Sequence, residues 1–419
     1  MKKVLILANQ FPPMGGSGVQ RTLKFVKYLP EFGIKPIVVT KKYNGKLLDK
    51  TLLKELPKDL KIYRLKAYET VENKSIFRLP IKFVGTRLTP PDGEYFWYYF
   101  NRKKAADILK KENIDCIYST SYPYSGHLLG LYLKREFPHI KWIVDFRDEW
   151  TNNPYYADDF FKKLKYNRER KQEDQVTNEC DFLIANSKFM LDNFIKDTPK
   201  LKNHSTYIPN GYDEEDFVGL INKRDGGEKF VITHTGSLYG KRNLTEFLEG
   251  LKIAIEENGV DSENIEIRLV GNIHKTMAEE YAEKYNLEGK IKTLGYMNHR
   301  DSIQMLYNSD ILLLIIGKVE GAENFYSGKI FEYIRADRPI LAIVPEKGAA
   351  AEVVQETNTG IVVDPDNIKG ISDAITKYYR QWKNSKIEHD PNWDLVQKYS
   401  RRSQAGELAQ IIKSLNNAR

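Results

Sequence analysis

The sequence predicts an α/β protein with two Rossmann-like, doubly wound parallel-sheet domains that face a central cleft. Three observations carry this prediction. A chain of 419 residues is longer than a single hydrophobic core usually supports. Short apolar segments with little alternation recur between amphipathic helical segments, which is typical of parallel strands covered on both faces. Acids and glycines interrupt this pattern at NGYDEEDFVGLINKRDGGEKF, which marks a boundary between two sets of elements.

The apolar segments define the predicted strands of each set in chain order. The first set contains Val4–Ala8, Pro36–Thr40, Cys116–Thr120, Lys141–Phe146, Asp181–Asn186 and Thr206–Pro209. The second set contains Phe230–Thr235, Ile265–Gly271, Ile291–Gly295, Asp310–Ile316, Pro339–Val344 and Thr359–Val363. Helical periodicity fills most gaps, as in Asn243–Glu257, Ser327–Ala336 and Ala349–Glu356. We therefore expect one domain over residues 1–215 and a second over residues 216–395.

The two halves of the chain differ in charge. Residues 1–210 hold 38 Lys and Arg against 24 Asp and Glu, a net charge of +14, whereas the remainder holds 27 against 33, a net charge of −6. A basic half suits nucleic acid, an anionic membrane surface or a phosphorylated substrate as partner. For any single lysine, a solvated helix face is the better explanation.

Composition and short signals limit the class of protein. The longest purely apolar run, Ile311–Ile316, is far shorter than a membrane span. Five apolar residues after the initial Met-Lys-Lys are too few for a signal peptide. Two cysteines, Cys116 and Cys180, fit a reducing compartment and offer no metal-ligand spacing. We expect a cytoplasmic protein.

A glycine-rich loop follows the first predicted strand, in LANQFPPMGGSGVQRTLKF. Ligands bind at the carboxyl ends of strands in doubly wound folds, so Gly16, Ser17 and Gly18 should line a binding crevice. Arg21, one turn into the following helix, can reach an anion. The loop lacks the third glycine of a dinucleotide fingerprint. The alternative is a turn whose glycines serve only to reverse the chain.

The segment GAENFYSGKIFEYIRADRPIL predicts a nucleoside-diphosphate clamp, by which we mean Gly328, Lys329 and Glu332. Ser327 is a plausible N-cap, so a helix should start near Gly328. Its free N–H groups and the Lys329 ammonium suit a diphosphate. Glu332 lies roughly 6 Å further along the helix axis, where it can accept both hydroxyls of a ribose. In the alternative, Glu332 is a surface acid and Lys329 its ion-pair partner.

Two further cations, Lys241 and Arg242, follow the predicted strand Phe230–Thr235 in HTGSLYGKRNL. They belong to the same domain as the clamp and come after the carboxyl end of a strand. They can therefore neutralise phosphates from the opposite side, and arginine can do so with two parallel hydrogen bonds.

These motifs occur in an order that resembles one enzyme family. The Pro-Pro-Gly-Gly opening, SYPYSGHLLG, WIVDFRDEW, IPNGYDEEDF, HTGSLYGKRNL and KIFEYIRADRPIL resemble the retaining glycosyltransferases of family 4, which have the GT-B architecture. The similarity covers almost the whole chain. It implies an acceptor-binding N-terminal domain, a C-terminal domain that binds a nucleotide-sugar, and a closing helix in residues 396–419 that crosses back to the first domain.

The resemblance also implies roles for individual donor-side residues. Glu332 matches the residue that binds the ribose hydroxyls. The diphosphate cations match Lys329 and either Lys241 or Arg242. The remaining donor contacts fall on Ser327, Gly328, the base-side pair Tyr296 and Met297, and the loop of Gly16, Ser17 and Gly18.

The chain departs from the family pattern at two positions. The family often has Glu-x7-Glu, whose first acid contacts the transferred sugar, but Asn324 occupies that position, eight residues before Glu332. Sugar contact then passes to Asn324 or to backbone groups. Ser237 occurs where many relatives carry arginine, and Arg242 can compensate.

Residues of the first domain are implied as catalytic or acceptor-binding. His127 matches a family histidine near the reaction centre, although a single histidine at a helix start is more often structural. Asp145, Arg147 and Asp148, in WIVDFRDEW, either bind acceptor or form an internal ion-pair network.

Retaining members of the family are thought to react by front-face attack, with the departing phosphate assisting deprotonation of the acceptor. We therefore predict His127, Arg242 and Lys329 as catalytic. The predicted reaction needs no metal and no cofactor beyond the nucleotide-sugar.

The aromatic run around Trp97, in EYFWYYFNRKK, suggests a place for the acceptor. Aromatic rings beside cations suit a membrane surface that holds a lipid-linked sugar phosphate, and they equally suit a helix packed into the core. With the basic first half, we favour peripheral association at the inner face of the cell membrane.

Two other functions also fit features of the sequence. A GT-B nucleotide-sugar epimerase would share the clamp but act without an acceptor. A nucleic-acid-binding protein would explain the basic half, but the sequence contains no stacking module or groove-reading motif, so we expect no nucleic-acid partner.

Overall fold

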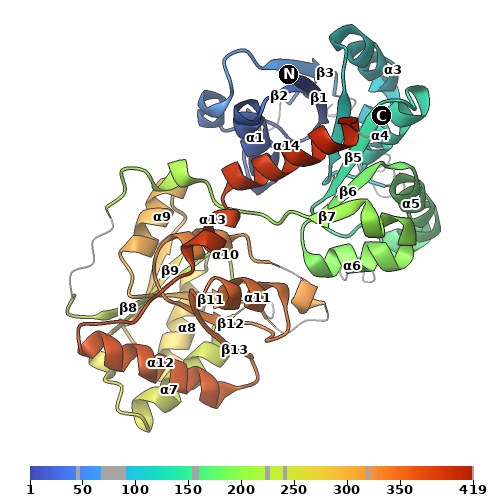
Figure 1. Cartoon of the computed structure of the whole chain (residues 1–419). Helices are drawn as coiled ribbons and strands as arrows, with labels where there is room; N and C mark the ends of the chain where they lie inside the picture. Colours follow the sequence, from blue (N-terminus) through green and yellow to red (C-terminus); the bar gives the residue numbers. More distant parts are fainter. Residues whose placement is uncertain are drawn as a thin grey trace, which may run out of the picture. The chain divides into compact units, whose positions relative to one another are not determined.

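The computed structural model describes residues 1–43, 48–67, 91–152, 160–221, 227–238, 243–317, 321–324 and 326–417. The chain divides into two compact units, each built on its own sheet (Figure 1). Unit 1 comprises Met1–Pro209 and Arg401–Arg419, and unit 2 comprises Asn210–Ser400.

Unit 1 contains a seven-stranded sheet in the order β3-β2-β1-β4-β5-β6-β7, and all its paired strands are parallel. Its strands are β1 (Lys2–Leu7), β2 (Ile34–Lys41), β3 (Lys61–Leu65), β4 (Cys116–Thr120), β5 (Lys141–Phe146), β6 (Phe182–Ala185) and β7 (Ser205–Tyr207). The edge strand β3 is absent from the sequence prediction, because its half-buried KIYRL segment lacks a long apolar run. The other six are confirmed with ends within two residues.

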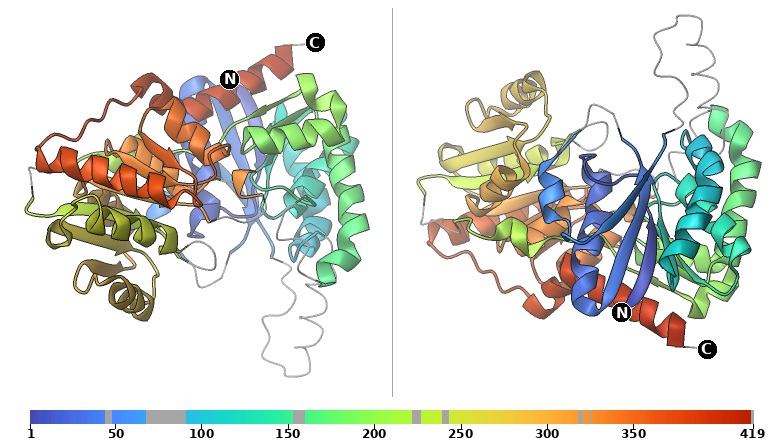
Figure 2. Two further views of the ribbon diagram at one scale, coloured as in Figure 1. Left: turned by 90° about the horizontal axis from the view of Figure 1, so that it is seen from below. Right: turned by 90° about the horizontal axis from the view of Figure 1, so that it is seen from above.

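Helices cover both faces of this sheet. They are α1 (Ser17–Tyr28), α3 (Tyr95–Glu112), α4 (Ser125–Glu136), α5 (Phe160–Glu179), α6 (Lys188–Asp197) and α14 (Arg401–Asn417), with 3-10 turns η1 (Leu29–Phe32), η2 (Thr51–Glu55) and η5 (Pro199–Asn203). The last helix of the chain, α14, lies beside α1 in all views (Figure 2). Its apolar side chains Ala405, Leu408 and Ile412 join the hydrophobic core on the face of the sheet that carries Val4 and Ile6 of β1.

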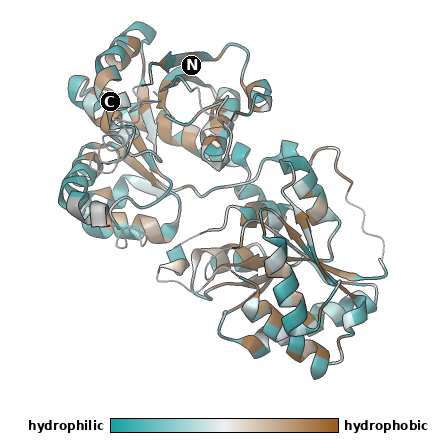
Figure 3. Cartoon of the chain, turned by 180° about the vertical axis from the view of Figure 1, so that it is seen from behind, coloured by the Kyte–Doolittle hydropathy of each residue, from teal (hydrophilic) through white to brown (hydrophobic). Residues whose placement is uncertain are grey.

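The inner strands β1, β2, β4 and β5 are buried on both faces, which explains why their sequences lack alternation. Along β1, Leu5 and Leu7 pack into one hydrophobic core and Val4 and Ile6 into the core on the opposite face. Hydropathy colouring shows apolar strands inside and polar residues on the outer helices (Figure 3).

Unit 2 repeats this design with a six-stranded parallel sheet in the order β10-β9-β8-β11-β12-β13. Its strands are β8 (Phe230–Thr235), β9 (Ile265–Val270), β10 (Ile291–Gly295), β11 (Ile311–Ile315), β12 (Ile340–Ile343) and β13 (Gly360–Val363). Its helices are α7 (Thr245–Glu256), α8 (Lys275–Tyr285), α9 (His299–Tyr307), α10 (Lys329–Arg335), α11 (Ala349–Glu356), α12 (Ile368–Lys383) and α13 (Trp393–Lys398), with 3-10 turns η6 (Glu214–Phe217), η7 (Ser262–Asn264) and η8 (Ala322–Asn324). All six predicted strands are confirmed.

Each sheet has a point where the chain reverses its direction of winding. In unit 1 this point lies between β1 and β4, and in unit 2 it lies between β8 and β11. Loops at the carboxyl ends of such strand pairs diverge and leave a crevice, which is where doubly wound folds bind ligands. A ligand-binding site is therefore expected in the segments that follow β1, β4, β8 and β11.

Candidate active site

In unit 2, the helix that carries the clamp is tied directly to the switch point. Tyr333 of α10 is fully buried, and its hydroxyl accepts a hydrogen bond from the backbone N–H of Thr235 at 2.7 Å. The Thr235 hydroxyl donates to the same oxygen at 3.2 Å. Because Thr235 ends β8, this contact holds the adjacent residue, Glu332, near the carboxyl edge of the sheet.

The start of α10 differs by one residue from the prediction. Gly328, not Ser327, is the N-cap, and no side chain caps the helix. Ser327 instead contributes its carbonyl, which accepts from the Ile330 N–H at 3.0 Å. Ile330 and Phe331 are buried, as the predicted core stripe requires, and Gly328 is exposed.

The clamp carboxylate lies between two basic side chains. The Lys329 ammonium is 3.2 Å from Glu332 Oε2, and His299 Nδ1 is 3.9 Å from Glu332 Oε1. The side chains of Glu332 and Lys329 are 17% and 33% exposed. The ion pair that the alternative interpretation described is therefore present. It also leaves both groups partly accessible on one side of α10.

His299 connects the clamp to a second carboxylate. Its Nε2 is 3.1 Å from Asp216 Oδ2, so the imidazole bridges η6 and α10. The hydrogen bond to Asp216, together with the field of Glu332, raises the pKa of His299 above its ordinary value of 6.5, although partial burial opposes this. Arg335 reinforces the same junction through a two-point contact with Glu214 at 2.8 and 3.0 Å.

The remaining predicted donor residues have different positions. Tyr296 follows β10 and is 87% exposed, and Met297 beside it is half-buried. Asn324 ends η8, and its N–H donates to the Gly321 carbonyl at 3.0 Å. Lys241 and Arg242 lie outside the described residues.

In unit 1, the glycine loop lies at the switch point between β1 and β4. Gly16 has φ +96°, a conformation that side-chain-bearing residues rarely adopt, and it is the N-cap from which α1 starts at Ser17. A Cβ on Gly18 would lie 1.8 Å from the Gln10 side chain. Arg147, after β5, holds the loop by donating from its guanidinium to the Gly18 carbonyl and, at 3.0 Å, to the Thr22 hydroxyl.

Arg21 does not reach a ligand, so its prediction as an acceptor contact is wrong. Its guanidinium is 1% exposed and makes two parallel bonds to Asp145 at 2.8 and 2.9 Å and a third to the Pro209 carbonyl at 2.7 Å. Tyr118 donates a hydrogen bond to the same carboxylate. Burial alone would raise the pKa of Asp145, but Arg21 holds it below its ordinary value. Asp145 thus forms the internal network.

The structure also contradicts a direct catalytic contact for His127. Its side chain is fully buried, its Nδ1 is 2.9 Å from the Ser119 hydroxyl, and its ring packs 4.5 Å from Phe146. Burial lowers the pKa of His127 to about 3, so the ring is neutral. The alternative of a structural histidine holds.

Trp97 is a second acceptor residue that the structure corrects. It is 1% exposed and belongs to the main core of unit 1, on the inner face of α3. Asp148, by contrast, is exposed after β5, and Arg147 is half-buried beside it.

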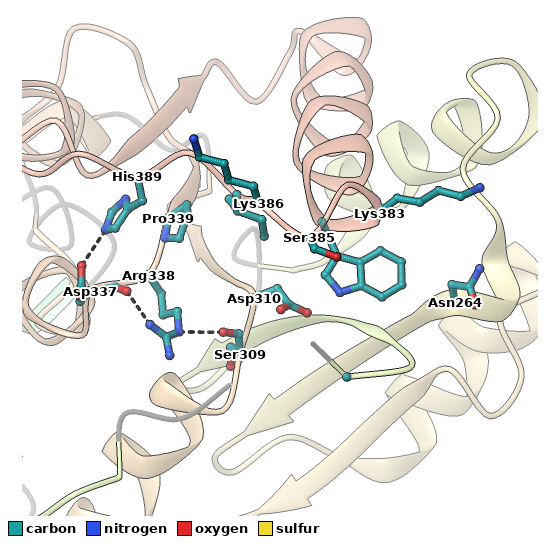
Figure 4. Close-up of a pocket in the computed structure, with 13 residues that line it drawn as sticks. Asn264, Ser309, Asp310, Asp337, Arg338, Pro339, Lys383, Ser385, Lys386 and His389 are labelled. Carbon is teal, nitrogen blue, oxygen red and sulfur yellow. Dashed lines mark hydrogen bonds and ion pairs between the residues drawn. The ribbon is translucent and has the colours of Figure 1, made fainter. Parts of the chain in front are cut away.

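A cavity of about 840 Å³ lies elsewhere in unit 2 (Figure 4). Its lining includes Asp310 and Pro339, which precede β11 and β12, so it adjoins the amino ends of the strands and not the clamp edge. Its Arg338 donates to the carbonyls of Ser309, Asp337 and Tyr307 at 2.8–2.9 Å. The guanidinium is therefore committed to the backbone.

Two absences apply to the described part of the chain. No group of three or more His, Cys, Asp or Glu side chains there is arranged to hold a metal ion. No helix there is both long and apolar enough to cross a membrane.

Comparison with known families decides the class of protein. The profile for Glycosyltransferase Family 4 matches residues 15–216, and the profile for Glycosyl transferases group 1 matches residues 221–390. The chain is a GT-B glycosyltransferase of the family 4 type. The boundary between the two matches falls close to the boundary between the two units.

Two curated proteins resemble parts of this glycosyltransferase. Mannosylfructose-phosphate synthase of Agrobacterium fabrum (strain C58 / ATCC 33970) is 22% identical over 233 residues, 51% of each chain. UDP-Gal:alpha-D-GlcNAc-diphosphoundecaprenol alpha-1,3-galactosyltransferase of Escherichia coli is 33% identical over 115 residues, 26% of this chain and 29% of that protein. The matches thus span about half or less of these relatives.

Solved structures share the fold of this glycosyltransferase over nearly their whole length. A glycosyltransferase from Rickettsia africae ESF-5 superposes with a TM-score of 0.64 at 17% identity, over 100% of this chain and 99% of that one. WaaG, a glycosyltransferase involved in lipopolysaccharide biosynthesis, has a TM-score of 0.54 at 14% identity, over 100% and 95%. A putative UDP-N-acetylglucosamine 2-epimerase from Listeria monocytogenes also matches, with a TM-score of 0.54 at 12% identity, over 100% and 98%. The fold alone therefore does not separate transferase from epimerase, and the family profiles do.

Several contacts around the candidate site join residues that are far apart in the sequence. His299 and Asp216 contact each other across 83 positions of sequence, and Tyr333 contacts Thr235 across 98. No local motif reports such contacts. Only the position of His299, shortly after a strand, marked it as a residue near the carboxyl edge.

Proposed function

We propose that this glycosyltransferase moves a hexose-type sugar, with retention, from a nucleoside-diphosphate-sugar to a glycan or lipid-linked acceptor. The synthesis of cell-surface polysaccharide or glycoconjugate is the process that such a reaction serves. One observation carries the proposal: a partly exposed carboxylate, Glu332, lies one turn after Lys329 on a helix held at the carboxyl edge of the unit 2 sheet. Three residues of helix separate the two groups by about 4.5 Å along the axis, so that one can contact the ribose while the other contacts the diphosphate.

The donor is recognised mainly through charge and hydroxyl contacts. Glu332 accepts the ribose hydroxyls, and Lys329 exchanges its contact with Glu332 for one with the diphosphate. Lys241 and Arg242 add positive charge, Tyr296 and Met297 flank the base, and the transferred sugar contacts Asn324.

The transfer step needs positioning and stabilisation of the departing diphosphate more than a dedicated base. The acceptor hydroxyl attacks the anomeric carbon on the face from which the diphosphate leaves, and its proton passes to a leaving-group oxygen. Lys329 and Arg242 stabilise the charge that develops on that group. The burial of His127 supports this assignment, since a fully buried ring does not reach an acceptor hydroxyl.

The names of the two relatives support the proposed classes of substrate. The E. coli relative is named for a UDP-galactose donor and a diphosphoundecaprenol-linked acceptor, and the Agrobacterium relative for synthesis of a sugar phosphate. We extend the donor class and the lipid-linked acceptor to this chain.

The outer face of α3 supports contact with a membrane surface. Phe100 is 55% exposed and Tyr99 is 42% exposed, and Lys103 and Lys104 follow on exposed positions. Aromatic rings with adjacent cations suit the interface of an anionic leaflet. Sedimentation with phosphatidylglycerol vesicles tests this contact. Equal recovery in the supernatant with and without vesicles would remove it, and Phe100→Glu should reduce binding.

A donor panel tests the proposal as a whole. Thermal shift with UDP, GDP, ADP and their hexose conjugates should show stabilisation by one nucleotide series. Incubation of that donor with candidate glycan and lipid-linked acceptors should release the nucleoside diphosphate, and NMR of the product should show the donor's anomeric configuration. Conversion of the sugar-nucleotide without any acceptor would favour an epimerase, and stabilisation by none of the nucleotides would contradict the proposal.

A further inference from the structure

Four polar and aromatic side chains meet at the switch point of unit 1, and none belongs to the predicted donor site. Asn9 follows β1, Lys41 ends β2, Glu94 is the N-cap of α3, and Tyr122 follows β4. All four therefore lie at the carboxyl edge of the sheet, where ligands bind in doubly wound folds.

The Glu94 carboxylate is held in one orientation from two sides. The Lys41 ammonium is 2.6 Å from Oε1, and the Asn9 amide nitrogen is 3.2 Å from Oε2. Lys41 and Asn9 are buried, whereas the Glu94 side chain is 24% exposed. A carboxylate has about four lone-pair positions, so each oxygen keeps acceptor capacity beyond these two contacts.

The backbone beneath this carboxylate is also anchored. Asp92 is 4% exposed and accepts from the Ser125 N–H at 3.0 Å, the Ser125 hydroxyl at 2.7 Å and the Glu94 N–H at 2.9 Å. One buried carboxylate thus joins the start of α3 to the start of α4. Glu94 therefore projects from a rigid corner of the fold.

Tyr122 supplies an aromatic surface near the carboxylate. It is 47% exposed, and its ring packs edge-on against Tyr124 at 5.7 Å, which stacks on Trp150 at 4.8 Å. Burial of part of the ring, followed by the fields of Asp92 and Glu94, raises the pKa of Tyr122. Tyr122 is three residues before Ser125, which binds Asp92, and Asp92 binds the Glu94 N–H, so the ring lies at the same corner of the fold as Glu94.

This combination favours a sugar ring over a charged ligand. The Lys41 and Glu94 charges cancel as a close pair, and Asp92 adds negative charge, so these three described side chains offer no excess positive charge to a phosphate. A supported aromatic face packs against the apolar C–H face of a pyranose, and a fixed carboxylate with an amide beside it accepts and exchanges hydrogen bonds with hydroxyls.

We propose that Glu94 and Tyr122 form the subsite for the acceptor's terminal neutral pyranose, with Glu94 accepting from ring hydroxyls and Tyr122 stacking on the ring. Lys41, Asn9 and Asp92 are positioning residues for Glu94. The subsite rests on the proposed transfer reaction for its role. Its binding of a sugar ring is measurable without that reaction.

The test uses the full-length protein and saturation-transfer NMR with the methyl glycosides of glucose, galactose, mannose and N-acetylglucosamine. At least one glycoside should receive saturation from the wild-type protein. Tyr122→Ala should weaken its binding about tenfold, since a stacked aromatic contact has that order of effect, and Tyr122→Phe should retain binding. Glu94→Gln should weaken it as well. Trp393→Ala, which removes a 43% exposed aromatic ring of unit 2, is the matched control and should bind as the wild type does.

Two results would overturn the subsite. The first is the absence of saturation transfer from the wild-type protein to any of the four glycosides. The second is unchanged binding in both Tyr122→Ala and Glu94→Gln. Nucleotide-induced thermal stabilisation, measured on the same variants, should remain at the wild-type level. Failure of the donor proposal would remove that stabilisation from the wild type while leaving glycoside binding intact, so the two failures are distinguishable.

Discussion

Replacement of Glu332 by alanine tests the donor site most directly. The carboxylate is proposed to accept both ribose hydroxyls, and each charge-assisted hydrogen bond contributes about 1.5–3 kcal/mol. The wild type first has to give up part of its contact with Lys329, a partly exposed pair at 3.2 Å whose loss costs about 1 kcal/mol. The two hydrogen bonds together, less the Lys329 contact, leave about 2–5 kcal/mol of binding free energy to be lost.

A loss of about 2.7 kcal/mol corresponds to roughly 100-fold weaker binding of the nucleoside diphosphate. The fold itself should tolerate the change. Glu332 is not part of the buried stripe of α10, and alanine is a strong helix former, so the free energy of unfolding should fall by only about 1 kcal/mol, mainly through loss of the pair with Lys329.

Isothermal titration calorimetry with the preferred nucleoside diphosphate measures this effect, and circular dichroism checks the fold. Glu279→Ala is the matched control, because Glu279 also pairs with a lysine of its own helix, Lys275, at 3.5 Å on α8. The control should bind as the wild type does. Binding by Glu332→Ala within about threefold of the wild type, less than 0.7 kcal/mol, would refute the ribose assignment.

Three further predictions concern charge and metal dependence. NMR titration should place the pKa of His299 above 6.5, and Asp216→Asn should lower it; an unchanged value contradicts the bridge. The charged form of His299 contributes its full stabilisation of unit 2 when the pH is below the pKa of histidine in the unfolded chain. This contribution is lost as the pH rises through the higher pKa of His299 in the folded protein. Arg21→Met should lower unfolding stability by about 3–5 kcal/mol in denaturant titration, because Asp145 stays charged and buried. Arg21→Met with Asp145→Leu should recover part of that loss, and no recovery would contradict this reasoning. Activity should persist in excess chelator, whereas strict dependence on added manganese would contradict metal-independent transfer.

The double-domain fold was predictable because parallel strands buried on both faces leave a strong local signal. Ile311–Ile315 is apolar at every position and Lys141–Phe146 is buried at every position from Trp142 to Phe146 without alternation, and helical periodicity separates such segments. The edge strand β3 was missed because one of its faces is only half-buried, so its composition does not differ from that of a loop.

The proximity of Lys329 and Glu332 was predictable for a related reason. Lys329 and Glu332 are three residues apart on one helix, so helical geometry alone places them together. Gly16 was recognisable in the same local way, since its positive φ demands a glycine.

The sequence by itself thus determined what depends on neighbours along the chain: the alternation of strands and helices, the position of the loops, and side-chain pairs within one turn. Only the tertiary structure decided which charged side chains are accessible. Arg21 and His127 are polar residues near the starts of α1 and α4, yet both are buried. Arg21 is enclosed by Asp145 and Pro209, more than a hundred residues away. His127 packs against Ser119 of β4 and Phe146 of β5. Burial and long-range pairing depend on how distant segments pack, and that information is spread over the whole chain.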